Sequence, residues 1–189
     1  MTRELLDGSR IFVIRDFCTA QECAAFIAQS ENAGYDEATI TTSAGFVMNK
    51  DVRDNARLIL DDAELAASLW ERAREFVPGR LRAWQAVGLN ERFRFYRYDS
   101  GQKFAPHWDG YFRRDNGEQS QLTFMVYLND DFTGGETKFY REDGALRLEV
   151  KPETGMALVF VHQQLHEGAP VVWGRKYVLR TDVMYARCE

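Results

Sequence analysis

The second half of the chain restricts the fold most, because it consists of short apolar or alternating segments separated by turn residues. Strands are predicted at Arg92–Tyr98, Gln121–Leu128, Glu136–Tyr140, Leu146–Val150, Met156–Val161, Val171–Val172 and Lys176–Tyr185. Turn residues such as Gly134-Gly135 separate them. Strands that recur about every ten residues with turns between them are typical of an all-β sandwich or barrel. The sequence therefore predicts a core of two packed sheets.

Two helices are predicted ahead of this β core. Thr19 and Glu22 have the spacing of a capping box, which opens a helix that should stop near Gly34. A second helix should open at Asp61 and end before Pro78-Gly79. Its apolar stripe would consist of Leu65, Leu69, Ala73 and Phe76. We expect one α+β domain, mainly β, over residues 1–189, with a helical N-terminal part (1–91) packed on a core (92–187).

Composition excludes several classes of protein. The net charge is −5 with the signs interspersed, which argues against a surface that coats nucleic acid. The longest apolar run, Met156–Val161, is far below the ~20 residues of a membrane-spanning helix. The N-terminus lacks the apolar core of a signal peptide. Three cysteines without a CxxC pair, Cys18, Cys23 and Cys188, suit a reducing compartment. We expect a soluble, cytoplasmic protein without membrane or nucleic-acid partners.

A candidate metal site involves two of the three histidines in the chain. His107 and Asp109 are two positions apart, so in an extended segment both side chains lie on one face. His166 follows Asp109 by 57 residues, just after the apolar run that ends at Val161. Two histidines and one carboxylate form the facial triad that holds non-haem Fe(II) and leaves positions open. A His-x-Asp pair alone is common, and by itself it would indicate only a solvated turn.

The surrounding residues make the motif more specific. Three segments are informative: Tyr98 to Asp109, which contains Pro106-His107-Trp108-Asp109; Phe124–Asn129 with Gly134-Gly135; and His166 to Lys176. Together they resemble the 2-oxoglutarate/Fe(II) oxygenase superfamily, in particular its prolyl 4-hydroxylase-like branch, over roughly residues 92–185. The resemblance implies a double-stranded β-helix, or jelly-roll, core. It also implies that His107, Asp109 and His166 bind Fe(II), with 2-oxoglutarate as cosubstrate and ascorbate as a candidate reductant.

The resemblance also implies roles for residues that bind the cosubstrate. Lys176 has the spacing of the branch's cation for the far carboxylate of 2-oxoglutarate, Tyr127 that of a tyrosine which binds the same group, and Tyr98 belongs to the matching segment. Arg180 lies four residues beyond Lys176 on the same face of a strand, so it is an alternative anchor. Arg175 would point to the opposite face. The expected reaction is hydroxylation with O2, or demethylation through it, which releases succinate and carbon dioxide.

Two positions need separate interpretation. His162 precedes His166 by four residues, and an HxxxH pair on a helix can bind zinc. Because His162 follows an apolar strand and no HExxH glutamate is present, we interpret it as a strand-end or supporting residue. Phe104 stands where the branch has a tyrosine. This departure removes a hydroxyl and prevents a direct transfer of the substrate preference of collagen-type enzymes.

The substrate is the least constrained prediction. Residues 110–117 should form a lip of the pocket, and a candidate set for substrate contact consists of Trp108, Tyr111, Arg113 and Arg53, with Arg57 and Arg114 as further cations. Arginines suit a small acidic metabolite, whereas the resemblance indicates a prolyl residue. A charged surface loop explains the same residues equally well. Two rival functions also remain, a cupin-like metal-binding module without turnover and a zinc hydrolase or isomerase that uses the same ligands.

Overall fold

The computed structural model describes residues 1–37, 40–42, 45–47 and 51–188. It contains helices α1 (Ala20–Ala33) and α2 (Ala63–Ala73). The strands are β1 (Thr2–Asp7), β2 (Ile11–Arg15), β3 (Asp36–Glu37), β4 (Ile40–Thr42), β5 (Gly45–Val47), β6 (Ala56–Asp61), β7 (Arg80–Leu81), β8 (Trp84–Leu89), β9 (Arg92–Tyr98), β10 (Phe104–His107), β11 (Gln119–Tyr127), β12 (Thr133–Gly134), β13 (Thr137–Tyr140), β14 (Leu146–Val150), β15 (Ala157–Val161), β16 (His166–Gly168), β17 (Val171–Trp173) and β18 (Lys176–Arg187).

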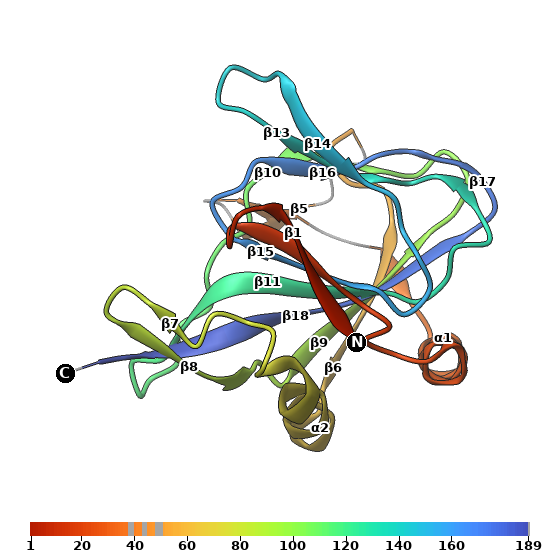
Figure 1. The fold of residues 1–189 in the computed structure, drawn as a ribbon. Helices are drawn as coiled ribbons and strands as arrows, with labels where there is room; N and C mark the ends of the chain where they lie inside the picture. The colour runs from red at the N-terminus through yellow and green to blue at the C-terminus, as the bar shows by residue number, and fades with distance from the viewer. Residues whose placement is uncertain (38–39, 43–44, 48–50, 189) are drawn as a thin grey trace.

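Two antiparallel sheets face each other (Figure 1). The large sheet has the order β1-β2-β15-β11-β18-β9-β6-β3, and β8 also pairs with β18. The small sheet has the order β10-β16-β13-β14. Because strands distant in sequence are neighbours in both sheets, the arrangement is the double-stranded β-helix that the sequence predicted. Among the described residues, no helix is long and apolar enough to cross a membrane.

Side chains of the large sheet alternate between two hydrophobic clusters. On β15, Val159 packs in the cluster that contains residues of α1 and α2, while Phe160 packs in the second cluster. On β2, Phe12 and Val13 are divided in the same way. Successive strand residues point to opposite faces, so a strand buried on both faces must be apolar throughout. This explains the continuous apolar run near residues 156–161. The helices cover one face of the large sheet, and the other face is turned toward the small sheet.

Helix α1 agrees with the predicted caps, whereas α2 starts one residue later than predicted and ends at Ala73, so Phe76 of the predicted stripe lies beyond it. Thr19 and Glu22 form the capping box of α1, and Gly34 ends that helix. Asp62 caps α2 by accepting from Leu65 N, so the start predicted at Asp61 is one residue too early. Asp61 instead ends β6, where its carboxylate binds Arg92. Two adjacent aspartates satisfy the same sequence rule, and pairing of β6 with β9 determines which one caps the helix.

The N-terminal residues contribute more strand than the sequence indicated. β1, β2, β6 and β8 all join the large sheet, with β2 beside β15 and β6 beside β9. β2 ends at Arg15, because Asp16 adopts a positive φ of 55°. Residues 1–91 therefore extend the large sheet in addition to forming the two helices, which lie below it in Figure 1.

Candidate active site

Strand pairing brings the two distant histidines together. β10 pairs with β16 in the small sheet, and His107 and His166 are direct cross-strand partners. Asp109 follows β10, and its oxygens lie 3.8 Å from His107 Nε2 and 3.7 Å from His166 Nε2. One ligand atom from each of the three residues falls within 4.8 Å of the others. The predicted triad is thus assembled at one point between the sheets.

Hydrogen bonds at Nδ1 orient both imidazoles so that their Nε2 atoms can bind one metal ion. The Nδ1 atom of His107 lies 2.8 Å from the carbonyl oxygen of Ala105, and that of His166 lies 2.9 Å from the carbonyl oxygen of Gln164. A carbonyl only accepts, so Nδ1 carries the proton and Nε2 keeps its lone pair for the metal. Burial lowers the pKa of His107 to about 3, with His166 adding to the effect. Both features suit a metal, which requires neutral imidazoles.

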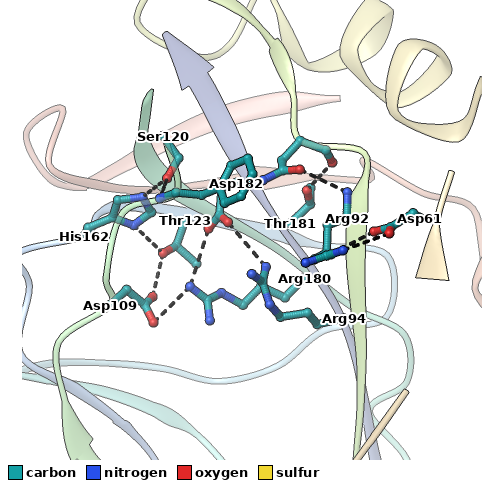
Figure 2. Close-up of polar contacts among 12 residues, drawn as sticks. Asp61, Arg92, Arg94, Asp109, Ser120, Thr123, His162, Arg180, Thr181 and Asp182 are labelled. Carbon is teal, nitrogen blue, oxygen red and sulfur yellow. Dashed lines mark hydrogen bonds and ion pairs between the residues drawn. The ribbon is translucent and has the colours of Figure 1, made fainter. Parts of the chain in front are cut away.

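The carboxylate of Asp109 is held from two other strands (Figure 2). Thr123 on β11 donates to Oδ2 at 2.6 Å, and Arg180 on β18 lies 2.9 Å from Oδ1. Burial alone would raise the pKa of Asp109, but the Arg180 guanidinium outweighs it and, with the hydrogen bond from Thr123, keeps the pKa below its usual range. Asp109 is therefore ionised and fixed in orientation, as a metal ligand requires. These neutral nitrogens and this carboxylate fit Fe(II).

One cavity joins the triad to Lys176. It is lined by the triad and by residues of both sheets, among them Tyr98, Met125, Thr137 and Val178. Lys176 is 2% exposed, and its Nζ donates to the carbonyl of Gly135 at 2.6 Å. The ammonium group also lies 5.3 Å from the ring centre of Tyr98 and 5.4 Å from that of Tyr127. Burial lowers the pKa of Lys176 to about 7.

Gly135 of the predicted turn lies against the side chain of Lys176. Gly135 has a φ of +69°, and a Cβ atom there would lie 3.2 Å from Cδ of Lys176. Glycine thus permits both the turn and the close passage of the lysine side chain. The hydroxyl of Tyr127 is 2.7 Å from Thr137 Oγ1, and Thr137 rather than Tyr127 belongs to the cavity lining among the described residues.

Arg180 lies on the same face of β18 as Lys176 but has different partners. Its guanidinium contacts Asp109, Asp182 at 3.4 Å and the hydroxyl of Tyr96 at 3.4 Å. Arg175 points to the other side, where it binds Asp99 and is about half-exposed. Lys176, the anchor that the sequence favoured, and Arg180, its alternative, therefore occupy different electrostatic environments.

A second, wider cavity opens on the other side of His107 and Asp109. Its volume is about 600 Å³, and four arginines contribute to its lining: Arg53, Arg57, Arg94 and Arg180. Trp108 and Tyr111 belong to its rim and are 64% and 63% exposed. We call this cavity the arginine groove. Phe104 lies between the groove and the triad, with Arg53 4.4 Å from its ring centre and His107 stacked on it at 3.6 Å.

The structure corrects part of the predicted lip. Arg113 lines a separate cavity with Trp84 and Arg187 rather than the arginine groove. The backbone of Arg113 pairs with that of Gln119 in an isolated β-bridge, and Phe112, the residue before Arg113, lines the arginine groove. Neighbouring extended residues point to opposite faces, so the two side chains must diverge. Arg114 is also occupied, because it binds Glu91 and Glu118.

Several residues around Asp109 were not predicted. Thr123 lies in the middle of β11, and Asp182 lies in β18, where it binds Arg94 at 3.3 Å. Ser120 binds Nε2 of His162 at 2.9 Å. For Thr123, a polar residue inside the apolar stretch of β11 was the available signal, since a buried polar group needs a partner. Ser120 and Asp182 have polar neighbours in their strands, so the sequence carried no comparable signal for them. His162 itself is buried and supports other residues, as its interpretation anticipated.

Comparisons with known proteins agree with this site. The profile of the 2OG-Fe(II) oxygenase superfamily matches residues 93–181. Probable prolyl 4-hydroxylase 3 of Arabidopsis thaliana is 26% identical over 199 residues, which cover 89% of this chain and 67% of that protein. Probable prolyl 4-hydroxylase 10 of the same plant is 31% identical over 118 residues, 48% of this chain and 41% of that protein. The chain thus spans about two thirds, or less, of the length of these curated relatives.

Solved structures share the fold. The viral collagen prolyl hydroxylase of Paramecium bursaria Chlorella virus-1 superposes with a TM-score of 0.67 at 23% identity, covering 96% of this chain and 99% of that chain. A Trichoplax adhaerens prolyl hydroxylase, solved with a hypoxia-inducible-factor peptide, gives 0.70 at 17% identity, with coverages of 93% and 83%. Profile, relatives, fold and His-Asp-His site lead to one assignment. The matching profile, the relatives and the His-Asp-His site support a prolyl 4-hydroxylase-like 2OG-Fe(II) oxygenase.

Proposed function

We propose that this enzyme hydroxylates an unactivated C–H bond and consumes 2-oxoglutarate and O2, with succinate and carbon dioxide as coproducts. The observation that carries the proposal is the single cavity that contains both the triad and the buried cation Lys176. Fe(II) and 2-oxoglutarate, when bound, supply the oxygen-activating chemistry. His107, Asp109 and His166 hold the metal, and the chain's remaining task is to bind, orient and shield the organic ligands.

Lys176 is the group that we assign to the far carboxylate of 2-oxoglutarate. Its ammonium contacts a carbonyl and two aromatic rings, and no carboxylate hydrogen-bonds to it in the described part of the chain. The charge of Glu136 raises the pKa of Lys176, but burial outweighs it, so an incoming carboxylate that hydrogen-bonds to the ammonium gains a strong interaction. Arg180 is already paired with Asp109 and Asp182. Lys176 is therefore the better anchor, and apolar neighbours such as Val178 exclude water from it.

Anaerobic titration with Fe(II) and 2-oxoglutarate tests this function. A weak visible charge-transfer band should form only when both are present, and Lys176→Ala should shift its formation to higher 2-oxoglutarate concentration. A cupin-like metal-binding module or a zinc hydrolase would bind the metal without this band. Absence of the band in a sample that demonstrably binds Fe(II) would refute the proposal.

For the substrate, we propose a molecule that carries a carboxylate or phosphate and binds in the arginine groove. Arg53 is 5% exposed, and its Nη2 atom is buried without a hydrogen-bond partner among the described residues. Its Nε binds Asn55, and its guanidinium lies over the rings of Tyr96 and Phe104, so none of these contacts neutralises it. An anionic group of the substrate would supply the negative charge that neutralises the Arg53 guanidinium.

The neighbouring pKa values support an excess of positive charge in the groove. Burial alone would raise the pKa of Tyr96, yet Arg180, Arg53 and Arg94 lower it to about 8. Burial, and then the charge of Arg53, lower the pKa of Arg57. Both shifts indicate a positive potential beside the metal ligands. A small acidic metabolite fits this potential directly.

A prolyl residue of a peptide is the second candidate. Two observations favour it: the relatives are named prolyl 4-hydroxylases, and the rim exposes Trp108 and Tyr111, which offer apolar ring faces. Substrate-stimulated succinate release should be compared for acidic metabolites, acidic Pro-containing peptides and neutral Pro-rich peptides. Stoichiometric stimulation by neutral peptides, with hydroxyproline detected by mass spectrometry, would overturn the anionic class. Stimulation by acidic peptides alone would retain the anionic class and identify its carrier.

A further inference from the structure

A chain of hydrogen bonds connects the lip of the arginine groove to the metal ligand Asp109. It runs from the backbone N–H of Phe112 to Ser120 Oγ (2.8 Å), from there to His162 (2.9 Å), to Thr123 (3.0 Å) and to Asp109 Oδ2 (2.6 Å). Figure 2 shows the four side chains in line, with His162 between the two hydroxyls. Ser120, Thr123 and His162 are each 1% exposed.

The donors and acceptors of this chain follow from the chemistry of its ends. An ionised carboxylate only accepts, so Thr123 donates to Asp109 and must accept from His162 Nδ1–H. In the neutral imidazole Nε2 then accepts, so Ser120 donates to it and accepts from Phe112 N–H. Burial lowers the pKa of His162, which agrees with the neutral form. Each hydroxyl therefore accepts one bond and donates one, all in the same direction.

Two backbone bonds connect the same residues a second time. Asp109 N–H donates to the carbonyl of His162 at 3.2 Å, and Ser120 N–H donates to the carbonyl of Phe112 at 2.8 Å. His162 thus binds Asp109 both directly, through its backbone carbonyl, and indirectly, through Thr123. Ser120 binds both the backbone N–H and the backbone carbonyl of Phe112. Because both ring nitrogens of His162 have partners, its imidazole has no lone pair left for a metal.

We propose that Ser120, His162 and Thr123 are positioning residues that fix the orientation of the Asp109 carboxylate and couple it to the conformation of the groove lip. Residues that hydrogen-bond to metal ligands set the ligand orientation, and their loss lowers metal affinity by about 10–100-fold. The inference rests on the proposed function only through Asp109 as a metal ligand. It adds that metal binding restricts the lip, which carries Tyr111 and Phe112 of the groove.

Mn(II) affinity, measured from the signal of free Mn(II) in electron paramagnetic resonance, tests the first half. Thr123→Val should weaken binding about 10–100-fold, whereas Thr123→Ser, which keeps the hydroxyl, should restore it to nearly the wild-type value. Thr181→Val is the matched control, because Thr181 is an equally buried threonine on the next strand whose hydroxyl binds the carbonyl of Asn90. It should lower thermal stability without changing Mn(II) affinity.

Hydrogen exchange of the segment around residues 108–118, with and without Mn(II), tests the second half. Mn(II) should slow exchange at the lip in the wild type, Thr123→Ser and Thr181→Val, and should lose this effect in Thr123→Val and Ser120→Ala. Wild-type Mn(II) affinity in Thr123→Val, or equal losses in Thr181→Val, would overturn the positioning role while leaving the proposed function intact. If wild type and His107→Ala bind Mn(II) equally weakly, the metal site and the proposed function fail together.

Discussion

The two cavities on either side of the triad differ in how they carry positive charge. The inner cavity, which joins the triad to Lys176, shares Arg180 with the arginine groove, and its other cation is the buried lysine, whose ammonium contacts a carbonyl and two aromatic rings. The arginine groove has four arginines, of which Arg94 and Arg180 are paired with buried Asp182. Lysine can lose its proton when buried, whereas arginine keeps its charge and must be balanced by neighbours.

This difference in charge suits two kinds of ligand, a constant cosubstrate in the inner cavity and a variable substrate in the arginine groove. Lys176 begins β18 in the middle of the large sheet, so rigid strands set its distance to the metal ligands. The arginine groove combines β9 and β18 with the lip and with Arg53 from outside the named strands. An inner cavity of this kind suits one dicarboxylate of constant length. The groove is the part of the molecule where substrate preference can differ among relatives with the same fold.

The largest effect should come from the triad, of which His107 and Asp109 line both cavities. Replacing His107, Asp109 or His166 individually by Ala should abolish 2-oxoglutarate turnover, because three ligands are the minimum set that holds the iron. Succinate production should fall to the background of the metal-free protein, while circular dichroism shows an intact fold. Near-native succinate production by any two of these variants would contradict the assignment of the site.

The next effect should distinguish the two cations of β18. Lys176→Ala should weaken 2-oxoglutarate binding by two orders of magnitude or more, on the order of 3 kcal/mol, since the ligand carboxylate would be buried unpaired. Arg180→Ala should affect 2-oxoglutarate markedly less and should weaken Mn(II) binding instead, because Arg180 pairs with Asp109. A reversed order of the two effects on 2-oxoglutarate would make Arg180 the anchor.

The inner cavity should also be the pH-sensitive one. The pKa of Lys176 is about 7 in the free protein. Above this pH the free lysine is neutral, and binding of the carboxylate must take up a proton. The dissociation constant of 2-oxoglutarate should therefore rise about tenfold per pH unit above 7. Titrations at pH 7, 8 and 9 measure the slope. In Lys176→Arg, which stays charged throughout this range, the slope should disappear even though affinity at pH 7 is lower.

The smallest effect should be in the groove. Arg53→Gln should raise the KM of an anionic substrate roughly fivefold, about 1 kcal/mol, because the other arginines of the groove remain to bind the anion. The 2-oxoglutarate KM should stay unchanged. Arg92→Gln is the matched control, since Arg92 is an exposed arginine paired with Asp61 outside the groove. Equal effects of both substitutions would show that only net charge matters, and would remove Arg53 as a specific contact.

Local sequence patterns were sufficient for the parts of the fold that have strong periodicity. The strands at Arg92–Tyr98 and Leu146–Val150 were predicted with the observed bounds, and the capping box at Thr19 opens α1. The strands that carry His107 and His166 were missed. They are only four and three residues long, and each includes a residue that disfavours strands, Pro106 or Gly168. Their pairing across the small sheet depends on partners that no local pattern encodes.

The sequence by itself indicated the double-stranded β-helix and the three metal-site residues through its resemblance to a known family, and strand alternation accounts for the close pair His107 and Asp109. Tertiary structure decided which cation lies where. Arg113 points away from the groove because its neighbour Phe112 points into it. Pairing of β11 with β18 brings Arg180 and Thr123 to different oxygens of Asp109. Those contacts join residues more than ten positions apart in the chain, and strand register, which places every side chain on one face or the other, is a property of the assembled sheet.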